Sequence, residues 1–378
     1  MSDVGVLGSP RRAAVDARGA VTLPRGFRCG WLVGADDRWH DPAVDVAVRQ
    51  RRLTPAPGFE TAMRVPSGDA RQRVFGVGGP GDLVVLEVEN DSPVPFVLGL
   101  ALGGRRSRFD VVAGGVVRAD GRPLVVAPRP PARWATAVSV ATSGGATGEP
   151  LSGVDASELV VLWPVAHRTV FRLALALARD VPDDVLLARL PSADEVVAGW
   201  RAQLGRGMQV TVPGERLQAD VDSARADALL ASSSVARPDA ALLVALEDWG
   251  FDAEAGAAWH RAGWRARRAA RARRVGGGVL RDVCDRLVVD RGVGEIDVVV
   301  QLPDDWRGRS LDVRDAPTRS GLVSYSVRWH GEHPALLWEV REARGPVVLR
   351  APGLDPAWST TEHSGEVLLH RSVSRPGG

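Results

Sequence analysis

The sequence LEDWGFD, residues 246–252, joins the two clearest helical segments of a chain that otherwise has the pattern of strands. Before the junction, Leu242, Leu246 and Trp249 recur at the spacing of one helical face. Gly250 suits a C-terminal helix cap, and a second helical pattern begins directly after it. The stretch therefore predicts a tight hairpin of two helices.

This hairpin belongs to a helical island that we place at residues 214–290. Upstream of the hairpin, apolar residues at i, i+4, i+7 and i+11 from Leu217 predict an amphipathic helix. Downstream of it, residues 279–289 predict a further helix. Residues 192–204, with Ser192 as the capping residue, predict a linker helix that precedes the island.

Short apolar runs separated by turn sequences fill residues 29–178. The separators, such as GGPGD at 78–82 and NDSP at 90–93, are rich in Gly, Pro, Asp and Ser. Some runs alternate, as in a sheet with one solvated face, and others are apolar throughout, as in strands covered on both faces. A large antiparallel β-sandwich accounts for both kinds. The expected strands are 59–65, 73–77, 83–88, 96–102, 109–117, 124–127, 135–140, 159–165 and 169–175.

Strand patterns return after the island, and residues 322–340 predict a β-hairpin that turns at 330–334. The other expected strands are 295–302, 347–349 and 367–369. The sequence thus predicts a mainly β protein with a helical insert. The expected parts are an N-terminal antiparallel β-sandwich at 1–185, a linker helix and helical-hairpin region at 186–291, and a small C-terminal β unit at 292–378.

Composition narrows the class of protein. The chain has 378 residues, 45% of them hydrophobic and 25% charged, which is typical of a folded globular protein of two or three domains. All 48 basic residues are arginine, which indicates the GC-rich coding sequence of a high-GC bacterium. A net charge of only +2 argues against a general nucleic-acid partner.

Cysteine usage and hydropathy set the expected location. Cys29 and Cys284 stand far apart and imply no disulfide framework. No run of eighteen apolar residues and no signal-peptide core is found in the sequence, so we expect a cytoplasmic protein with no membrane partner.

Two carboxylates at the end of the first hairpin helix are candidates for chemistry. Glu247 and Asp248 lie at the C-terminal end of their helix, where the helix dipole disfavours negative charge by about 0.3–1 kcal/mol each. Residues that are locally unfavourable in this way indicate a functional role. The alternative is a structural role, in which Arg261 and Arg265 of the next helix form ion pairs with these carboxylates. Glycoside hydrolysis needs two carboxylates on a common site, and adjacent helical residues point apart. Glu247 and Asp252 are therefore the candidate catalytic residues.

Twelve tryptophans against one tyrosine raise the question of stacking on sugar rings, although core packing explains most of them. The segment with the strongest polar-aromatic character lies near the N-terminus. Its candidate carbohydrate-binding residues are Trp31, Asp36, Asp37, Trp39 and His40.

Residues 261–274 contain seven arginines in fourteen residues. The alanines of this region share one helical face and the arginines the other, which is typical of a helix with one buried and one solvated face. A protein partner that binds the arginine face is the open alternative. His330, Glu332 and His333 lie in a predicted turn without further ligands at a metal-binding spacing, so neither a metal nor any other cofactor is expected.

The order of these parts resembles glycoside hydrolases of the glucoamylase-like and glycogen-debranching-like kind. The strings VENDSP at 88–93, LEDWGFD at 246–252 and RWHG at 328–331 carry the likeness together with the architecture. The resemblance implies a supersandwich joined to a toroid of six helical hairpins. Residues 214–290 have room for about two hairpins at ordinary helix lengths of about 11–12 residues.

We therefore expect a toroid-deficient relative of these enzymes that binds carbohydrate or has a structural role. Such a protein would act alone, with another chain, or as a homo-oligomer. Two alternatives stay open at this point. One is an active glycosidase that uses carboxylates of the helical region, and the other is a protein-binding module that acts through the arginine-rich helix.

Overall fold

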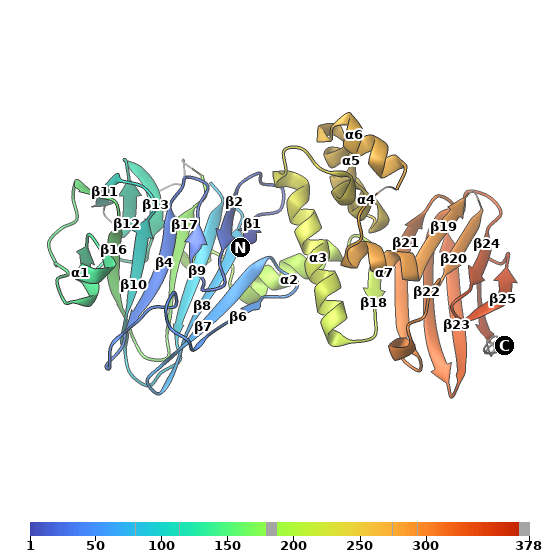
Figure 1. The fold of residues 1–378 in the computed structure, drawn as a ribbon, viewed down its shortest axis with the longest axis horizontal. Helices are drawn as coiled ribbons and strands as arrows, with labels where there is room; N and C mark the ends of the chain where they lie inside the picture. Colours follow the sequence, from blue (N-terminus) through green and yellow to red (C-terminus); the bar gives the residue numbers. More distant parts are fainter. Residues whose placement is uncertain (80, 113, 179–186, 274, 293, 370–378) are drawn as a thin grey trace. The chain divides into compact units, whose positions relative to one another are not determined.

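The computed structural model describes residues 1–79, 81–112, 114–178, 187–273, 275–292 and 294–369. The chain divides into two compact units, a first unit of Met1–Gly199 and a second unit of Trp200–Gly378. The prediction of a mainly β protein with a helical insert is confirmed (Figure 1). The helical island at 214–290 and the C-terminal strands fall in the second unit, and the boundary between the units falls within the linker helix. The finer division at residues 185 and 291 stays a prediction.

The first unit is a sandwich of two antiparallel sheets (Figure 1). The eight-stranded sheet has the order β1 (Ser2–Gly5), β2 (Arg12–Val15), β3 (Val21–Thr22), β4 (Arg28–Gly34), β10 (Phe96–Gly103), β16 (Leu159–Val165) and β14 (Arg133–Ala135), with β5 (Trp39–His40) paired to β4. The nine-stranded sheet has the order β15 (Val154–Ala156), β11 (Ser107–Val112), β12 (Val116–Ala119), β13 (Arg122–Val126), β17 (Val170–Ala176), β9 (Leu83–Asn90), β8 (Gly68–Val77), β7 (Gly58–Val65) and β6 (Val48–Arg52).

The core of the sandwich follows from the alternation along its strands. In β10, Leu98, Leu100 and Leu102 are fully buried and belong to one core cluster with residues of both sheets. Burying each such side chain stabilises the fold by about 1.5–3 kcal/mol. In β9, Val84 and Leu86 face this core.

The outer face of the nine-stranded sheet has an apolar part that two short helical elements cover. These elements are η1 (Leu187–Arg189) and α2 (Ala193–Leu204). Val85 and Ala174 pack there with Ala193 and Val196, which explains why some strands are apolar throughout. Ser192 caps α2 as predicted, since the Glu195 backbone N–H donates to its Oγ at 3.3 Å.

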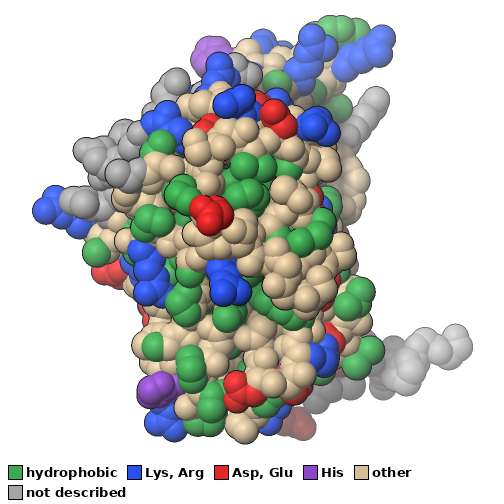
Figure 2. Space-filling view, turned by 90° about the vertical axis from the view of Figure 1, so that its left-hand side faces the viewer, with side chains coloured by type: hydrophobic (Ala, Val, Ile, Leu, Met, Phe, Trp, Pro, Cys, Tyr) green, Lys and Arg blue, Asp and Glu red, His purple; other side chains and the backbone are tan. Residues whose placement is uncertain are grey.

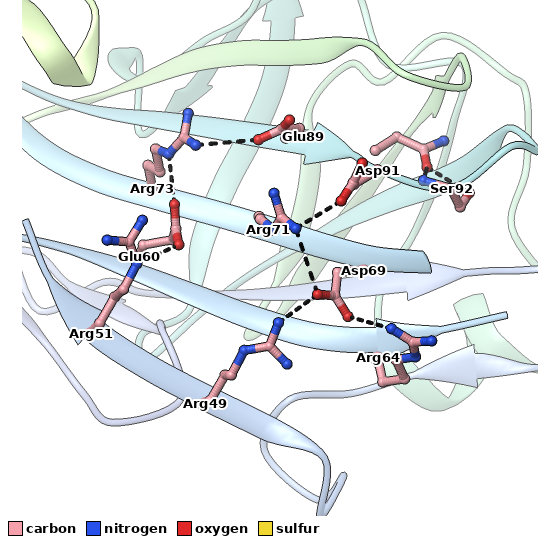
Figure 3. Close-up of polar contacts among 11 residues, drawn as sticks. Arg49, Arg51, Glu60, Arg64, Asp69, Arg71, Arg73, Glu89, Asp91 and Ser92 are labelled. Atoms are coloured by element: carbon pink, nitrogen blue, oxygen red, sulfur yellow. Dashed lines mark hydrogen bonds and ion pairs between the residues drawn. The ribbon is translucent and has the colours of Figure 1, made fainter. Parts of the chain in front are cut away.

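The remaining outer face of this sheet carries an ordered network of arginines and carboxylates (Figure 3). Glu60 is 7% exposed and accepts hydrogen bonds from Arg51 at 2.7 Å and Arg73 at 2.8 Å. Asp69 is 5% exposed and pairs with Arg49 at 2.5 Å and Arg64 at 3.4 Å. The buried carboxylates are thus each paired with more than one guanidinium, as burial of charge requires.

The second unit contains the predicted helical region. Its helices are α3 (Glu215–Ser234), α4 (Ala240–Asp248), α5 (Asp252–Arg261), α6 (Trp264–Arg271) and α7 (Val279–Leu287). Helices α4 and α5 contact each other on either side of Gly250, so the predicted helical hairpin is confirmed. Among the described residues, no helix is both long and apolar enough to cross a bilayer.

Two sheets complete the second unit. A five-stranded sheet has the order β18 (Gln209–Thr211), β21 (Leu311–Thr318), β22 (Gly321–His330), β23 (His333–Arg341) and β26 (Ser364–Leu368). A four-stranded sheet has the order β19 (Val288–Gly292), β20 (Glu295–Val298), β24 (Val348–Ala351) and β25 (Asp355–Thr360), and η2 (Asp304–Trp306) lies between β20 and β21 in the chain. Strands β20 and β24 are parallel, and the other pairs are antiparallel. The hairpin predicted at 322–340 is confirmed as β22 and β23.

Several expected elements are wrong. The strand expected at 135–140 ends at Ala135, and α1 (Val138–Thr142) follows, because the Val138 N–H donates to the Glu158 carboxylate at 2.8 Å. The helix expected at 279–289 ends at Leu287, where the chain turns directly into β19 and pairs with β20.

Two other expected elements are divided in the structure. The run at 109–117, of which residue 113 lies outside the described residues, contains the antiparallel pair β11 and β12. The arginine-rich helix is split into α5 and α6, because Ala262 and Gly263 adopt extended backbone conformations between them.

Candidate functional site

The second unit contains a pocket of about 330 Å³ at the meeting of α4, α7, β19 and the end of β21. We call it the carboxylate–arginine pocket, because seven charged side chains from distant parts of the sequence line it. They are Glu247, Asp248, Asp285, Asp290, Arg273, Arg281 and Arg319. The remaining lining includes Met208, Cys284 and short stretches of β19 and β21.

The ends of α4 fix where its two carboxylates lie. At the N-terminus, Asp239 accepts a hydrogen bond from the Leu242 N–H at 2.8 Å and so caps the helix. At the C-terminus, Gly250 takes a left-handed conformation with φ +73°, which favours glycine. The Met208 N–H donates to the Trp249 carbonyl at 2.9 Å, which ties the helix end to the segment before β18. The LEDWGFD junction therefore holds its carboxylates in a defined place.

Asp248 is held by two arginines. Arg273 is hydrogen-bonded to one carboxylate oxygen, and Arg281 lies 3.4 Å from the other. Arg281 also pairs with Asp285 at 2.8 Å, so these groups form one network. Burial raises the pKa of Asp248 above its ordinary value, and the two guanidiniums oppose that rise only in part.

Ion pairing at the end of α4 was predicted with other partners. Arg261 instead donates to the carbonyl groups of Ser232 and Ser233. Arg265 lies over the Trp264 ring, 5.6 Å from its centroid. The compensation for Asp248 therefore comes from beyond α6 and from α7.

Glu247 lines the same pocket, and its carboxylate accepts a hydrogen bond from the indole N–H of Trp259 in α5. Asp252, the other candidate catalytic residue, is the first residue of α5 and is exposed. It is not among the described residues that line the pocket. The structure thus separates Glu247 from Asp252 and places Glu247 with Asp285 and Asp290.

The sequence reasoning missed Asp285, Asp290 and Arg319. Asp285 carries one local signal, since it follows Arg281 at i, i+4 in a helix. Asp290 accepts hydrogen bonds from the Gly292 and Arg319 backbone N–H groups at 3.1 and 2.7 Å. The residues of that second contact are 29 positions apart in the sequence, so no local sequence pattern predicts it.

In the polar-aromatic segment of the first unit, Trp31 to His40, the first tryptophan is buried and not on the surface. Trp31 is 2% exposed and lies in the sandwich core, where its indole N–H donates to the Arg18 carbonyl at 3.1 Å. Its ring is therefore not available for stacking on a sugar from solvent. This burial does not fit a role for Trp31 as a carbohydrate-binding residue.

The other residues of that segment are divided between surface and interior. His40 is 4% exposed, with Nε2 at 2.9 Å from Asp37 and Nδ1 at 3.4 Å from Asp45. Trp39 is half-buried, whereas Asp36 and Asp37 are exposed. Carbohydrate binding by this segment stays a prediction.

Charges of both signs are mixed on the face of the molecule that Figure 2 shows. Arginine and acidic side chains both occur on that face, separated by hydrophobic and neutral residues.

The described residues include no group of three or more His, Cys, Asp or Glu side chains able to hold a metal ion. His330 is the last residue of β22 and His333 the first of β23, and the two pair across the turn at Gly331 and Glu332.

No protein-family model matches this chain, and no curated protein matches it at a significant level.

Proposed function

We propose that this protein binds a carbohydrate without cleaving it, in the carboxylate–arginine pocket of the second unit. In this proposal it is a toroid-deficient relative of the glucoamylase-like glycoside hydrolases. The observation that carries the proposal is that four carboxylates and three arginines line one pocket of about 330 Å³.

The chemistry of these groups suits a polyhydroxylated ligand. Carboxylates accept hydrogen bonds from sugar hydroxyl groups, and guanidiniums donate to hydroxyl and ring oxygens. The volume is at the lower end of the range of about 300–1,000 Å³ for small-molecule pockets, which fits one or two sugar rings. The ion pairs between Asp248, Arg281 and Asp285 hold these side chains in place before a ligand arrives, which lowers the entropic cost of binding.

The same ion pairs favour binding over hydrolysis. A glycosidase needs one protonated and one ionised carboxyl group on either side of the scissile bond. Asp248 and Asp285 are both engaged by arginines, and Asp252 lies outside the pocket lining. The arrangement therefore offers hydrogen-bonding partners for a sugar more readily than an acid and a nucleophile.

Titration calorimetry with a panel of mono- and disaccharides tests this proposal. We expect at least one saccharide to bind, and we expect Asp248→Asn and Arg281→Met to weaken that binding more than tenfold. Asp252→Asn is the matched control, since it removes an exposed carboxylate beside the same hairpin. Failure of every saccharide to bind, or equal affinity in the pocket variants and the control, would contradict the proposal.

A glycosidase is the second candidate function, and one observation favours it. Burial raises the pKa of Asp248 in a pocket that it shares with Glu247, and a carboxyl group with a raised pKa suits a general acid. Release of p-nitrophenol from p-nitrophenyl glycosides measures this activity directly. Turnover that is lost in Glu247→Gln and Asp248→Asn but kept in Asp252→Asn would establish it, and no turnover would dismiss it.

A further inference from the structure

A second, apolar pocket of about 270 Å³ lies within the second unit between α3, α4 and the segment that enters α7. We call it the alanine pocket. Its helical walls include Ala224 and Ala228 of α3 and Ala241 and Ala245 of α4, and its other wall is residues 275–281. Nothing in the proposed function so far uses this space.

The smallest side chains form part of the pocket wall, beside larger apolar ones such as Leu242, Val244 and Val279. The alanines stand at i, i+4 on each helix and contribute only methyl groups. Gly276 and Gly278 contribute no side chain, and a Cβ atom built at either one meets nothing within 4 Å. Protein interiors ordinarily leave few voids larger than a water molecule, so an opening of this volume has room for a ligand group.

Trp249 provides a polar feature in this lining. Its side chain is fully buried, and among the described residues its indole N–H has no hydrogen-bond partner. A buried donor without a partner is unfavourable, and an acceptor atom of a ligand would relieve that cost. The Arg225 guanidinium lies over the ring, 4.9 Å from its centroid, and keeps the indole in place.

The alanine pocket and the carboxylate–arginine pocket share two lining residues. Asp248 and Arg281 line both, and their ion pair at 3.4 Å stands where the two spaces meet. One ligand with a polar part and an apolar part can therefore place each part in the matching space.

We infer that the ligand is a glycoside with an apolar aglycone, such as a short alkyl or aryl group. The sugar occupies the carboxylate–arginine pocket and the aglycone occupies the alanine pocket, so that the glycosidic oxygen between them accepts from the Trp249 N–H. This inference rests on the proposed function and specifies its ligand class. Each buried methylene group is expected to tighten binding about fourfold, the equivalent of about 0.8 kcal/mol.

Calorimetry with methyl, butyl and hexyl glycosides of glucose, galactose and mannose tests the inference. With the wild-type protein, affinity should rise with chain length for the sugar that binds. Ala228→Leu and Ala241→Leu fill the pocket from facing helices, so each should abolish the gain with chain length and keep the affinity for the methyl glycoside. Ala253→Leu is the control, because it adds the same group at an exposed position of α5.

Trp249→Phe isolates the buried donor, since it removes the N–H and keeps an aromatic ring. We expect it to weaken binding of the hexyl glycoside about three- to tenfold. Circular dichroism of each variant checks that the helices persist.

The outcomes separate this inference from the proposed function. Equal affinity for methyl and hexyl glycosides would overturn the inference and leave sugar binding intact. A chain-length gain that survives in both filled-pocket variants would also overturn it. Absence of binding to every sugar and glycoside would overturn the proposed function itself.

Discussion

Glu60 is a buried carboxylate whose charge is kept by its neighbours on the sheet. Burial alone would raise its pKa, but hydrogen bonds and charge from Arg51 and Arg73 outweigh that effect and lower the pKa below the ordinary value of 4.5. A carboxylate with a lowered folded-state pKa contributes stability above its unfolded pKa, and that contribution is lost as the pH falls through the folded-state pKa. Glu60 therefore stabilises the first unit at neutral pH and not in acid.

We expect Glu60→Gln to lower the free energy of unfolding by about 1.5–3 kcal/mol near neutral pH, as for a hydrogen-bonded charge. The difference from wild type should shrink as the pH falls below the ordinary pKa of 4.5 and should disappear once the pH is below the lowered folded-state pKa. Urea denaturation at the two pH values measures both. Asp91→Asn, which breaks a more exposed pair with Arg71, should cost less than about 1 kcal/mol. An equal loss for Glu60→Gln at both pH values would contradict this account.

The pKa of Asp248 is shifted in the opposite direction to that of Glu60. Its pKa is raised by burial, so the ionised form is disfavoured in the folded protein, and its contribution to stability falls as the pH rises through the folded-state pKa. Asp248→Asn is therefore expected to keep or increase the stability at neutral pH while weakening sugar binding. Thermal melting and calorimetry on the same sample test the pair of results. A variant that loses stability together with binding would assign Asp248 a structural role instead.

At the scale of the element, close backbone approach at Gly207 fixes the end of α4. A Cβ atom at this position would lie 2.3 Å from the Trp249 carbonyl oxygen. Gly207→Ala should therefore displace the helix end and cost about 1–3 kcal/mol or more. Gly256→Ala is the matched control, since Gly256 lies inside α5 with nothing within 4 Å of its Cβ position. It should stabilise the protein by about 0.5–1 kcal/mol. Chemical denaturation that ranks the two variants in the reverse order would rule out this role for Gly207.

Most strands and helices could be predicted from the sequence, and the failures have physical causes. Half of the residues at 135–140 are β-branched, which favours a strand, but the structure has a helical turn there, whose Val138 N–H donates to Glu158. The apolar run after α7 continues without a break, and periodicity does not distinguish the last turn of a helix from the strand β19. Strands β1 to β3 were missed because they contain four residues or fewer, too few for an alternating pattern. Four longer strands, β4, β6, β21 and β25, were not expected either.

The site was predictable only in part. Glu247 was found because a carboxylate at a helix C-terminus breaks a local rule. Asp290 and Arg319 reach the pocket through a contact between β19 and the end of β21, which local sequence does not encode. Asp252 was the other candidate catalytic residue, yet it lies on the other side of the Gly250 turn and outside the pocket lining.

At the scale of the whole molecule, both pockets belong to the second unit, and no residue of the sandwich in the first unit lines either one. A ligand that binds only the folded second unit should therefore stabilise that unit. At a concentration of about 100 times the dissociation constant, the expected gain is about 2.7 kcal/mol. Differential scanning calorimetry with and without a bound glycoside measures it, and an unchanged melting profile would speak against binding to the native state.

Hydrogen–deuterium exchange on addition of the tightest-binding glycoside locates the ligand on the chain. We expect slower exchange in peptides that contain Glu247 to Trp249, Arg281 to Asp290 and Pro317 to Arg319, the segments that line the two pockets. In the peptide that contains Trp31 to His40 we expect unchanged exchange. Protection confined to residues 31–40, with the helical segments unaffected, would contradict ligand binding in the second unit.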